Sequence, residues 1–244
     1  MQLVRDNMFA LITGETGSGK STQLSQFMVD DLLLTDGTGT PSRVVITQPR
    51  RVAAIQMAKR VAYERGCDVG AEVGYTVRFD DRSSDAARTT EWHAGKGHRQ
   101  VTRIKYVTDG ILVRECLHDP NLLKYKVVIL DEAHERSLNT DILFSLVKRA
   151  CLNRKGDLRL IITSATLKTN KISEYYEKCP ILSVSGRCYP VSILHNPTPK
   201  SDRLNVAIQT AIRIHLHEPE GDVLCFLTGF EECERAVKIL NQKL

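Results

Sequence analysis

The sequence predicts an α/β fold in which a parallel sheet carries helices on both faces. Short apolar segments with the character of strands alternate with longer amphipathic segments with the character of helices, as in proteins of this class. Residues 127–130 are continuously apolar, which is typical of a central parallel strand buried on both faces. No internal repeat or low-complexity tract interrupts the alternation. One complete α/β domain therefore accounts for most of the chain.

The expected elements follow in chain order. Strands are predicted at residues 9–13, 43–47, 72–78, 104–108, 127–131 and 158–164, where short runs are apolar. Helices are predicted at residues 20–34, 50–65, 109–118, 141–153 and 168–178, where apolar positions recur along one face. Helices of this kind supply the crossovers that parallel strands need.

The last sixty or so residues differ from the rest. A boundary is expected near residues 186–190, and the prolines at 190, 197 and 199 indicate a linker. A helix at 204–217, a strand at 222–227 and a helix at 230–242 should follow. One such α-β-α unit is too small for a stable sheet. We therefore expect a first domain at 1–185, a linker at 186–203 and the incomplete start of a second domain at 204–244.

Composition limits the class of protein. The chain has 244 residues, 42% of them hydrophobic and 26% charged, which is ordinary for a globular protein that buries a core. No apolar run reaches the roughly 20 residues that span a bilayer, and the N-terminus lacks a signal-peptide layout. Seven cysteines without a C-x-x-C pair argue against a disulfide framework and a zinc site. A soluble intracellular protein is expected, and its net charge of +5 weakly favours a polyanionic partner.

Residues 14–21 fit the phosphate-loop pattern G-x-x-x-x-G-K-[ST] in full. The segment follows a predicted strand and opens a predicted helix, which is the context that the pattern requires. Its backbone N–H groups and the helix N-terminus should wrap phosphate oxygens. Lys20 should bridge the outer phosphates, and the Ser21 hydroxyl should bind Mg²⁺. A chance glycine-rich turn is the weaker reading, because strand, loop, lysine and hydroxyl occur in order.

Asp131 and Glu132 follow the buried strand at 127–130, at the sheet edge where the phosphate loop also lies. Alone, two acids after a strand are more often helix caps. Beside a phosphate loop, Asp131 should hold Mg²⁺ and Glu132 should polarise the attacking water. Ser164 and Thr166 also end a strand, where they could simply cap the following helix; they are informative because they follow the two nucleotide motifs in this order. The sequence thus predicts an Mg²⁺-dependent P-loop NTPase with ATP as substrate.

In this order the motifs resemble those of the DEAH-box (DEAH/RHA, superfamily 2) ATP-dependent RNA helicases. The string at 131–137, DEAHERS, resembles the DEAH box, and residues 14–22 resemble motif I. Segments 47–54, 108–115, 164–166 and 224–232 resemble motifs Ia, Ib, III and the start of IV. The resemblance implies a first RecA-like domain, the start of a second, and movement along single-stranded RNA gripped by its backbone without sequence specificity. It also implies a nuclear setting, with the cytoplasm as alternative, and leaves room for protein activators.

The resemblance assigns roles to individual residues. Catalysis is expected of Glu132, Asp131, His134 and Lys20, with Ser21 and Asp131 as the Mg²⁺ ligands. ATP is expected to contact Gly14, Glu15, Thr16, Gly17, Ser18, Gly19, Lys20, Ser21, Thr22 and Arg60. Coupling between lobes is expected of Ser164 and Thr166, together with His134. RNA is expected to contact Arg50, Arg51, Arg78, Phe79, Thr108 and Asp109. From the residues alone, Arg50 and Arg51 could equally be a solvated helix start, and His134 a packing residue.

Two departures from the family pattern stand out. Residues 85–100 look inserted, are mainly polar and contain Trp92, the one tryptophan of the sequence, which predicts a flexible surface loop, an added RNA contact or retained non-coding sequence. Motifs V and VI, with their arginine finger, are absent before Leu244. We therefore expect weak ATP binding and poor hydrolysis from this chain, or else a regulatory form that binds ATP and RNA without acting as a motor. The DEAH string argues against a nucleotide kinase, while DNA in place of RNA stays open.

Overall fold

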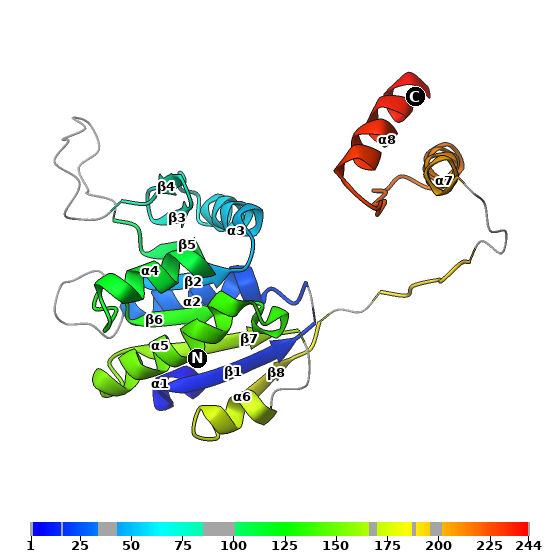
Figure 1. Ribbon diagram of the computed structural model, residues 1–244. Helices are drawn as coiled ribbons and strands as arrows, with labels where there is room; N and C mark the ends of the chain where they lie inside the picture. The colour runs from blue at the N-terminus through cyan, green and yellow to red at the C-terminus, as the bar shows by residue number, and fades with distance from the viewer. Residues whose placement is uncertain are drawn as a thin grey trace, which may run out of the picture. The chain divides into compact units, whose positions relative to one another are not determined.

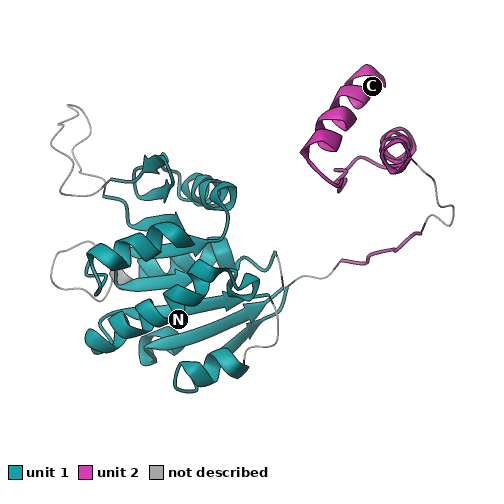
Figure 2. Cartoon of the chain, viewed as in Figure 1, with its two compact units in different colours: residues 1–188 teal, residues 189–244 magenta. Residues whose placement is uncertain are grey.

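The computed structural model describes residues 2–15, 17–33, 43–84, 101–165, 170–186, 189–195 and 202–243. The chain divides into two compact units, Met1–Cys188 and Tyr189–Leu244 (Figure 2). Each unit is described separately. Thr16, Thr166 and the predicted insertion at 85–100 lie outside the described residues.

The first unit is built on an eight-stranded sheet in the order β4-β3-β5-β2-β6-β7-β1-β8 (Figure 1). The strands are β1 (Phe9–Gly14), β2 (Val44–Gln48), β3 (Val73–Val77), β4 (Asp80–Arg82), β5 (Ile104–Thr108), β6 (Val127–Leu130), β7 (Arg159–Ser164) and β8 (Ile181–Val184). Neighbouring strands pair in parallel except β3 and β4, which form an antiparallel hairpin. The mostly parallel sheet confirms the predicted α/β fold class.

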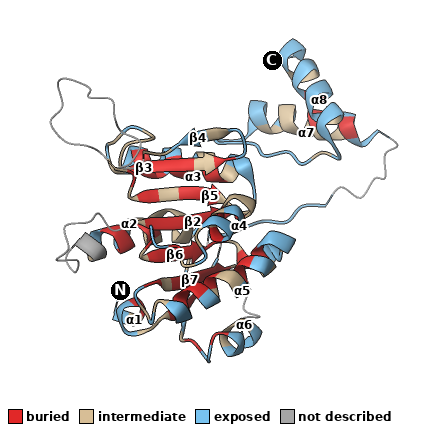
Figure 3. Ribbon diagram, turned by 60° about the vertical axis from the view of Figure 1, so that its left-hand side comes forward, coloured by how far each residue is buried: buried red, intermediate tan, exposed pale blue. Residues whose placement is uncertain are grey.

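Helices cover both faces of this sheet. They are α1 (Gln2–Asp6), α2 (Lys20–Leu33), α3 (Arg51–Glu64), α4 (Asp109–His118), the 3-10 turn η1 (Ala133–Glu135), α5 (Leu138–Asn153) and α6 (Asn170–Tyr175). One core cluster packs α1, α2 and α3 on one face, and a second packs α4, α5 and Tyr176 on the other. Strand residues alternate between the two clusters, so the central strands are buried on both sides (Figure 3). Their continuous apolar sequences follow from this placement.

The element boundaries show where local chemistry overrides periodicity. Helix α5 begins at Leu138, ahead of the predicted 141, because the Ser137 hydroxyl caps it by accepting a hydrogen bond from the Thr140 N–H at 3.0 Å. Helix α6 covers only 170–175 of the predicted 168–178 among the described residues. Helix α1, the short strand β4 and the edge strand β8 were not predicted from the sequence.

The described part of the second unit contains the helices α7 (Arg203–His217) and α8 (Phe230–Lys243), which pack through Leu204, Ile208 and Ala236. The strand predicted at 222–227 is wrong: these residues are described and form no strand. An extended segment forms a strand only where a neighbour pairs with its backbone, and the described part of 189–244 holds no strand. The apolar side chain of Phe226 is consequently 86% exposed.

Candidate nucleotide-binding site

The loop between β1 and α2 has the backbone that a phosphate-binding loop requires. Gly17 and Gly19 both adopt φ +84°, a left-handed conformation that residues with a Cβ rarely reach. Gly14 is glycine for a different reason: a Cβ there would lie 2.6 Å from the Val184 carbonyl oxygen of β8. The edge strand β8 therefore fixes where the loop leaves the sheet.

Lys20, the first residue of α2, folds back over this loop. Its ammonium donates hydrogen bonds to the carbonyl oxygens of Gly14 and Glu15, at 2.7 and 2.8 Å. A third contact joins it to the Ser18 hydroxyl at 3.1 Å. The loop thus holds a positive charge at its centre, and these contacts are of the kind that a phosphate group would replace.

A buried tyrosine supports the loop from below. Tyr106 on β5 donates a hydrogen bond from its hydroxyl to the Ser21 carbonyl oxygen at 2.7 Å, and the same hydroxyl lies 3.1 Å from the Ser25 hydroxyl. Burial raises the pKa of Tyr106, so this group stays a neutral donor. In the same turn of α2, the Thr22 hydroxyl donates to the Gly19 carbonyl at 3.3 Å. The sequence motifs do not reveal Tyr106, because the residue lies on a distant strand.

Asp131 lies at the carboxyl end of β6 and is 2% exposed. Three donors hold its carboxylate. Gln48 Nε2 donates to Oδ2 at 2.5 Å, the Glu132 N–H donates to Oδ1 at 3.0 Å, and the Thr163 hydroxyl also donates to Oδ1. Since Gln48 ends β2 and Thr163 lies on β7, three neighbouring strands fix this charge. Neither Gln48 nor Thr163 could be recognised from the sequence as a partner of Asp131.

Glu132 and His134 form a chain of contacts toward β7. Glu132 adopts φ 53°, and its Oε2 lies 3.3 Å from His134 Nε2. His134 Nδ1 accepts a hydrogen bond from the Ala165 N–H at 3.2 Å, so the ring proton belongs on Nε2, facing the glutamate. Burial and then the Asp131 charge raise the pKa of Glu132 against the opposing effects of His134 and Lys20. The lysine of the loop and both acids therefore share one site.

The remaining nucleotide candidates occupy varied positions. Ser164 ends β7 and is 2% exposed, directly before Ala165. Arg60 lies on α3 with an exposed side chain, and its Nε donates to Glu64 Oε1 at 2.6 Å. Glu64 also accepts from Gln23 of α2 at 2.8 Å, which places Arg60 beside the helix that the loop opens.

The arginines predicted to meet RNA begin α3. Arg50 is the residue before the helix, and its guanidinium lies 3.5 Å from the Glu135 carboxylate of η1. Arg51 is the first helical residue and is exposed. Both cations are therefore accessible beside the segment that carries the two acids.

The β3–β4 hairpin presents the other predicted RNA contact. Phe79 is 89% exposed and adopts φ 67°, a strained backbone for an aromatic residue. The Arg78 guanidinium lies 4.7 Å from the centre of its ring. An exposed ring held in a strained turn is a feature more typical of binding than of packing.

Thr108 and Asp109 open α4 and differ in exposure. Thr108 is partly exposed as the residue before the helix. Asp109 is 4% exposed, and its carboxylate accepts hydrogen bonds from Ser137 Oγ at 3.0 Å and Thr140 Oγ1 at 2.6 Å. The carboxylate therefore ties α4 to the start of α5.

Comparison with known proteins places this arrangement in a family. Residues 2–175 match the profile of the DEAD/DEAH box helicases. The chain belongs to this family. Over all 244 residues it is also 47% identical to the pre-mRNA-splicing factor ATP-dependent RNA helicase prp22 of Schizosaccharomyces pombe. The chain covers 19% of that protein's length. The resemblance drawn from the motifs is thereby confirmed. None of the described helices is both long and apolar enough to cross a membrane.

Proposed function

We propose that this chain is the ATP-binding lobe of an ATP-dependent RNA helicase, which couples hydrolysis of Mg-ATP to movement along single-stranded RNA. The chain of contacts from Glu132 through His134 to the Ala165 N–H carries the proposal. A motor of this kind must convert the state of the outer phosphate into movement of a second segment. This contact chain gives the nucleotide site such a connection, to the residue that follows β7. Membership of the helicase family supports the same reading.

The residues of the site suit Mg-ATP. Hydroxyl and carboxylate oxygens are the ligands that Mg²⁺ accepts, together with water and substrate phosphates. Ser21 and Asp131 would hold the ion, and because protein donors occupy the Asp131 oxygens, that carboxylate would act through bound water. Lys20 and the loop N–H groups would hold the phosphates. Bound Mg²⁺ would neutralise charge that develops on the outer phosphates.

Glu132 is the group that would orient and deprotonate the attacking water. Its raised pKa makes it a better proton acceptor than an ordinary carboxylate, because proton transfer improves as the pKa approaches the working pH. The His134 Nε2 proton would fix the orientation of this carboxylate. Glu132 thus has both a raised proton affinity and a carboxylate held in a fixed orientation.

The RNA strand would run past Arg50, Arg51, Thr108 and the Phe79 hairpin. The two arginines would bind phosphates, the start of α4 would offer N–H groups, and Phe79 would stack on a base. Such contacts read the backbone and do not select sequence. We propose a positioning role for Asp109, because its carboxylate is buried against Ser137 and Thr140.

Residues 204–244 are proposed to belong to a second RecA-like lobe, linked through residues 186–203 to a first lobe at 1–185. The exposed apolar side chains of Leu224 and Phe226 support the assignment to a second lobe, since a sheet would bury them. The relative named as a splicing factor supports a role in nuclear RNA processing.

Nucleotide binding and amide exchange test the proposal on the chain itself. A fluorescent ATP analogue with Mg²⁺ should bind, and Lys20→Ala should abolish this binding. The non-hydrolysable nucleotide AMP-PNP should change hydrogen exchange at the Ala165 amide in the wild type. His134→Ala should remove that change while keeping nucleotide affinity, and His118→Ala, on the exposed end of α4, should behave as wild type.

The two parts of the proposal fail in different ways. If Lys20→Ala binds the ATP analogue as tightly as the wild type does, the assignment of the ATP site is contradicted. Binding that requires Lys20 but leaves the Ala165 amide unchanged would contradict the coupling through His134.

A further inference from the structure

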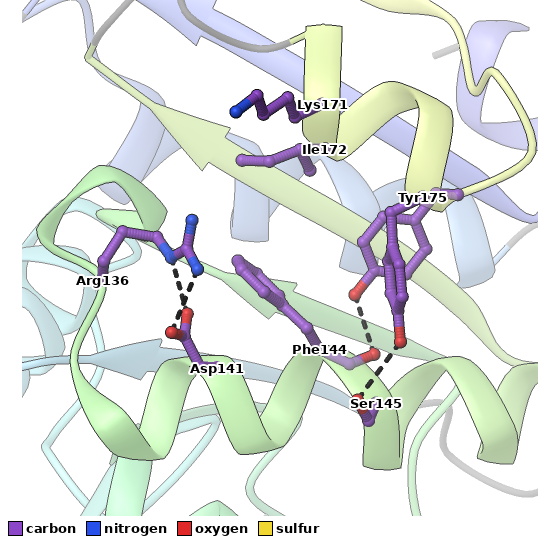
Figure 4. A pocket seen from close by; sticks show the side chains of 8 residues that line it. Arg136, Asp141, Phe144, Ser145, Lys171, Ile172 and Tyr175 are labelled. Carbon is purple, nitrogen blue, oxygen red and sulfur yellow. Dashed lines mark hydrogen bonds and ion pairs between the residues drawn. The ribbon is translucent and has the colours of Figure 1, made fainter.

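A pocket of about 270 Å³ opens between α5 and α6, and it shares no residue with the phosphate loop or the segment from Asp131 to His134 (Figure 4). We call it the α5–α6 pocket. Phe144 and Tyr176, which are 9% and 1% exposed, belong to its lining and to the core. Their rings meet edge to face at 6.2 Å between centroids. Ile172 of α6 lies across from Phe144. Rigid apolar walls are therefore available to a side chain that enters.

The rim of the α5–α6 pocket is polar and mainly cationic. The Arg136 guanidinium donates to both oxygens of Asp141, at 2.6 and 3.0 Å, so these two charges neutralise each other. Lys171 lies on the opposite side of the pocket and is exposed. No carboxylate of the described residues forms an ion pair with it, so Lys171 is an uncommitted cation at the mouth.

Tyr175 completes the rim and keeps much of its ring open. The side chain is 45% exposed. The Ser145 hydroxyl lies 3.2 Å from the Tyr175 hydroxyl, and the Lys148 ammonium lies 4.4 Å from the ring centroid. These contacts hold the ring in one orientation, so a ligand would not have to immobilise it.

We propose that the α5–α6 pocket binds an acidic peptide of a protein partner. One large apolar side chain of the peptide enters between Phe144 and Tyr175, and a neighbouring carboxylate pairs with Lys171. Aromatic anchors in preformed pockets carry much of the energy of peptide recognition. The charge pair at the rim selects acidic sequences and speeds association. The site is independent of the proposed ATPase function, because it uses other residues.

The volume and the apolar lining favour this occupant over the alternatives. The volume of about 270 Å³ lies just below the range of about 300–1,000 Å³ that is typical of sites for drug-sized ligands, and it is enough for one large side chain. The side chains of Phe144 and Ile172 offer no polar partner to the sugar hydroxyls and phosphates of an RNA strand. An apolar peptide side chain needs no such partner.

Backbone amide NMR of the 244-residue chain tests the proposal with a defined probe. The probe is an acetylated, amidated pentapeptide with phenylalanine between two pairs of glutamates. Two variants replace the glutamates by glutamine or the phenylalanine by alanine. The parent should shift the amides of Ser145, Lys171 and Tyr175 saturably, with a Kd in the millimolar range or tighter, and each variant should bind at least tenfold more weakly.

Matched protein variants separate charge from folding. Lys171→Gln should weaken binding of the parent peptide at least threefold, while Lys59→Gln, a change at another exposed lysine on α3, should leave the affinity unchanged. Equal melting temperatures would exclude unfolding as the cause. The proposal is overturned if the amide shifts are absent or do not saturate, or if the affinity does not depend on the phenylalanine or on Lys171. It is also overturned if an oligouridylate shifts the same amides and binds with a lower Kd than the peptide.

Discussion

Thr163→Val tests how strongly the nucleotide site holds its buried charge. The Thr163 hydroxyl donates to Asp131 Oδ1, and the two residues are 0% and 2% exposed. Valine keeps nearly the same shape but cannot donate. A hydrogen bond to a charged group contributes about 1.5–3 kcal/mol, and Asp131 keeps its donors from Gln48 and the Glu132 N–H. The free energy of unfolding should therefore fall by about 1.5–3 kcal/mol.

Thr47→Val is the matched control. Thr47 lies on the central strand β2, is also 0% exposed, and its hydroxyl has no hydrogen-bond partner among the described residues. Removing an unsatisfied buried hydroxyl should be neutral or should stabilise by about 1 kcal/mol. Both substitutions replace a hydroxyl by a methyl group at equally buried positions. The two sites differ in the hydrogen bond that Thr163 donates to Asp131.

Thermal unfolding followed by circular dichroism gives the comparison. At about 2–4 °C per kcal/mol for a unit of this size, Thr163→Val should lower the midpoint by about 3–12 °C. Thr47→Val should leave it unchanged or raise it. Equal losses in the two variants would refute the reasoning, because the cost would then belong to replacing threonine in a central strand.

Three further outcomes are expected. Because burial raises the pKa of Glu132, ionisation costs the folded state stability at neutral pH, so Glu132→Gln should raise the midpoint at pH 7. That gain should disappear as the pH falls toward 4.5, whereas the exposed change Glu174→Gln should have no effect at either pH. Gly14→Ala should cost about 1–3 kcal/mol of stability in a urea titration, because the new Cβ meets the β8 backbone. Gly110→Ala, at a helical position where the new Cβ would make only an ordinary contact with Asn139 Nδ2 at 3.5 Å, should gain about 0.5–1 kcal/mol in the same titration. Phe79→Gly should stabilise the fold by about 1 kcal/mol by relieving its positive φ, yet weaken oligouridylate binding roughly 5- to 150-fold in fluorescence anisotropy. An unchanged RNA affinity would count against stacking on Phe79.

The central strands were predictable because both of their faces are buried, which leaves a continuous apolar run such as Val127–Leu130. The edge strands were not. Asp80–Arg82 has no strand character of its own and is extended through its pairing with β3. Strand β8 lies at the other edge with Ile181 and Leu182 partly exposed, so its pattern carries little information. The residues at 222–227 show the converse error, an apolar run without a neighbour to pair with.

The residues of the site also separate into those that the sequence could predict and those that it could not. Residues 14–21 and Asp131 could be named from the sequence because each motif combines its chemistry with a local turn at a strand end. The partners that hold them could not. Gln48 and Thr163 reach Asp131, and Tyr106 reaches Ser21, only because the strand order brings distant segments together. Sequence spacing does not specify that order.

The position of β1 in the sheet has a consequence for the time course of synthesis. β1 ends at Gly14, yet among the described strands it pairs with β7 and β8, which begin at Arg159 and Ile181. At about 5–20 residues per second, a ribosome needs roughly 7–35 seconds to reach them after it has completed β1. During that interval the apolar strand has no lateral partner, and a chaperone would protect it from aggregation. β8 fixes the point at which the phosphate loop leaves the sheet. The loop is therefore among the last parts of the first unit to reach its folded structure.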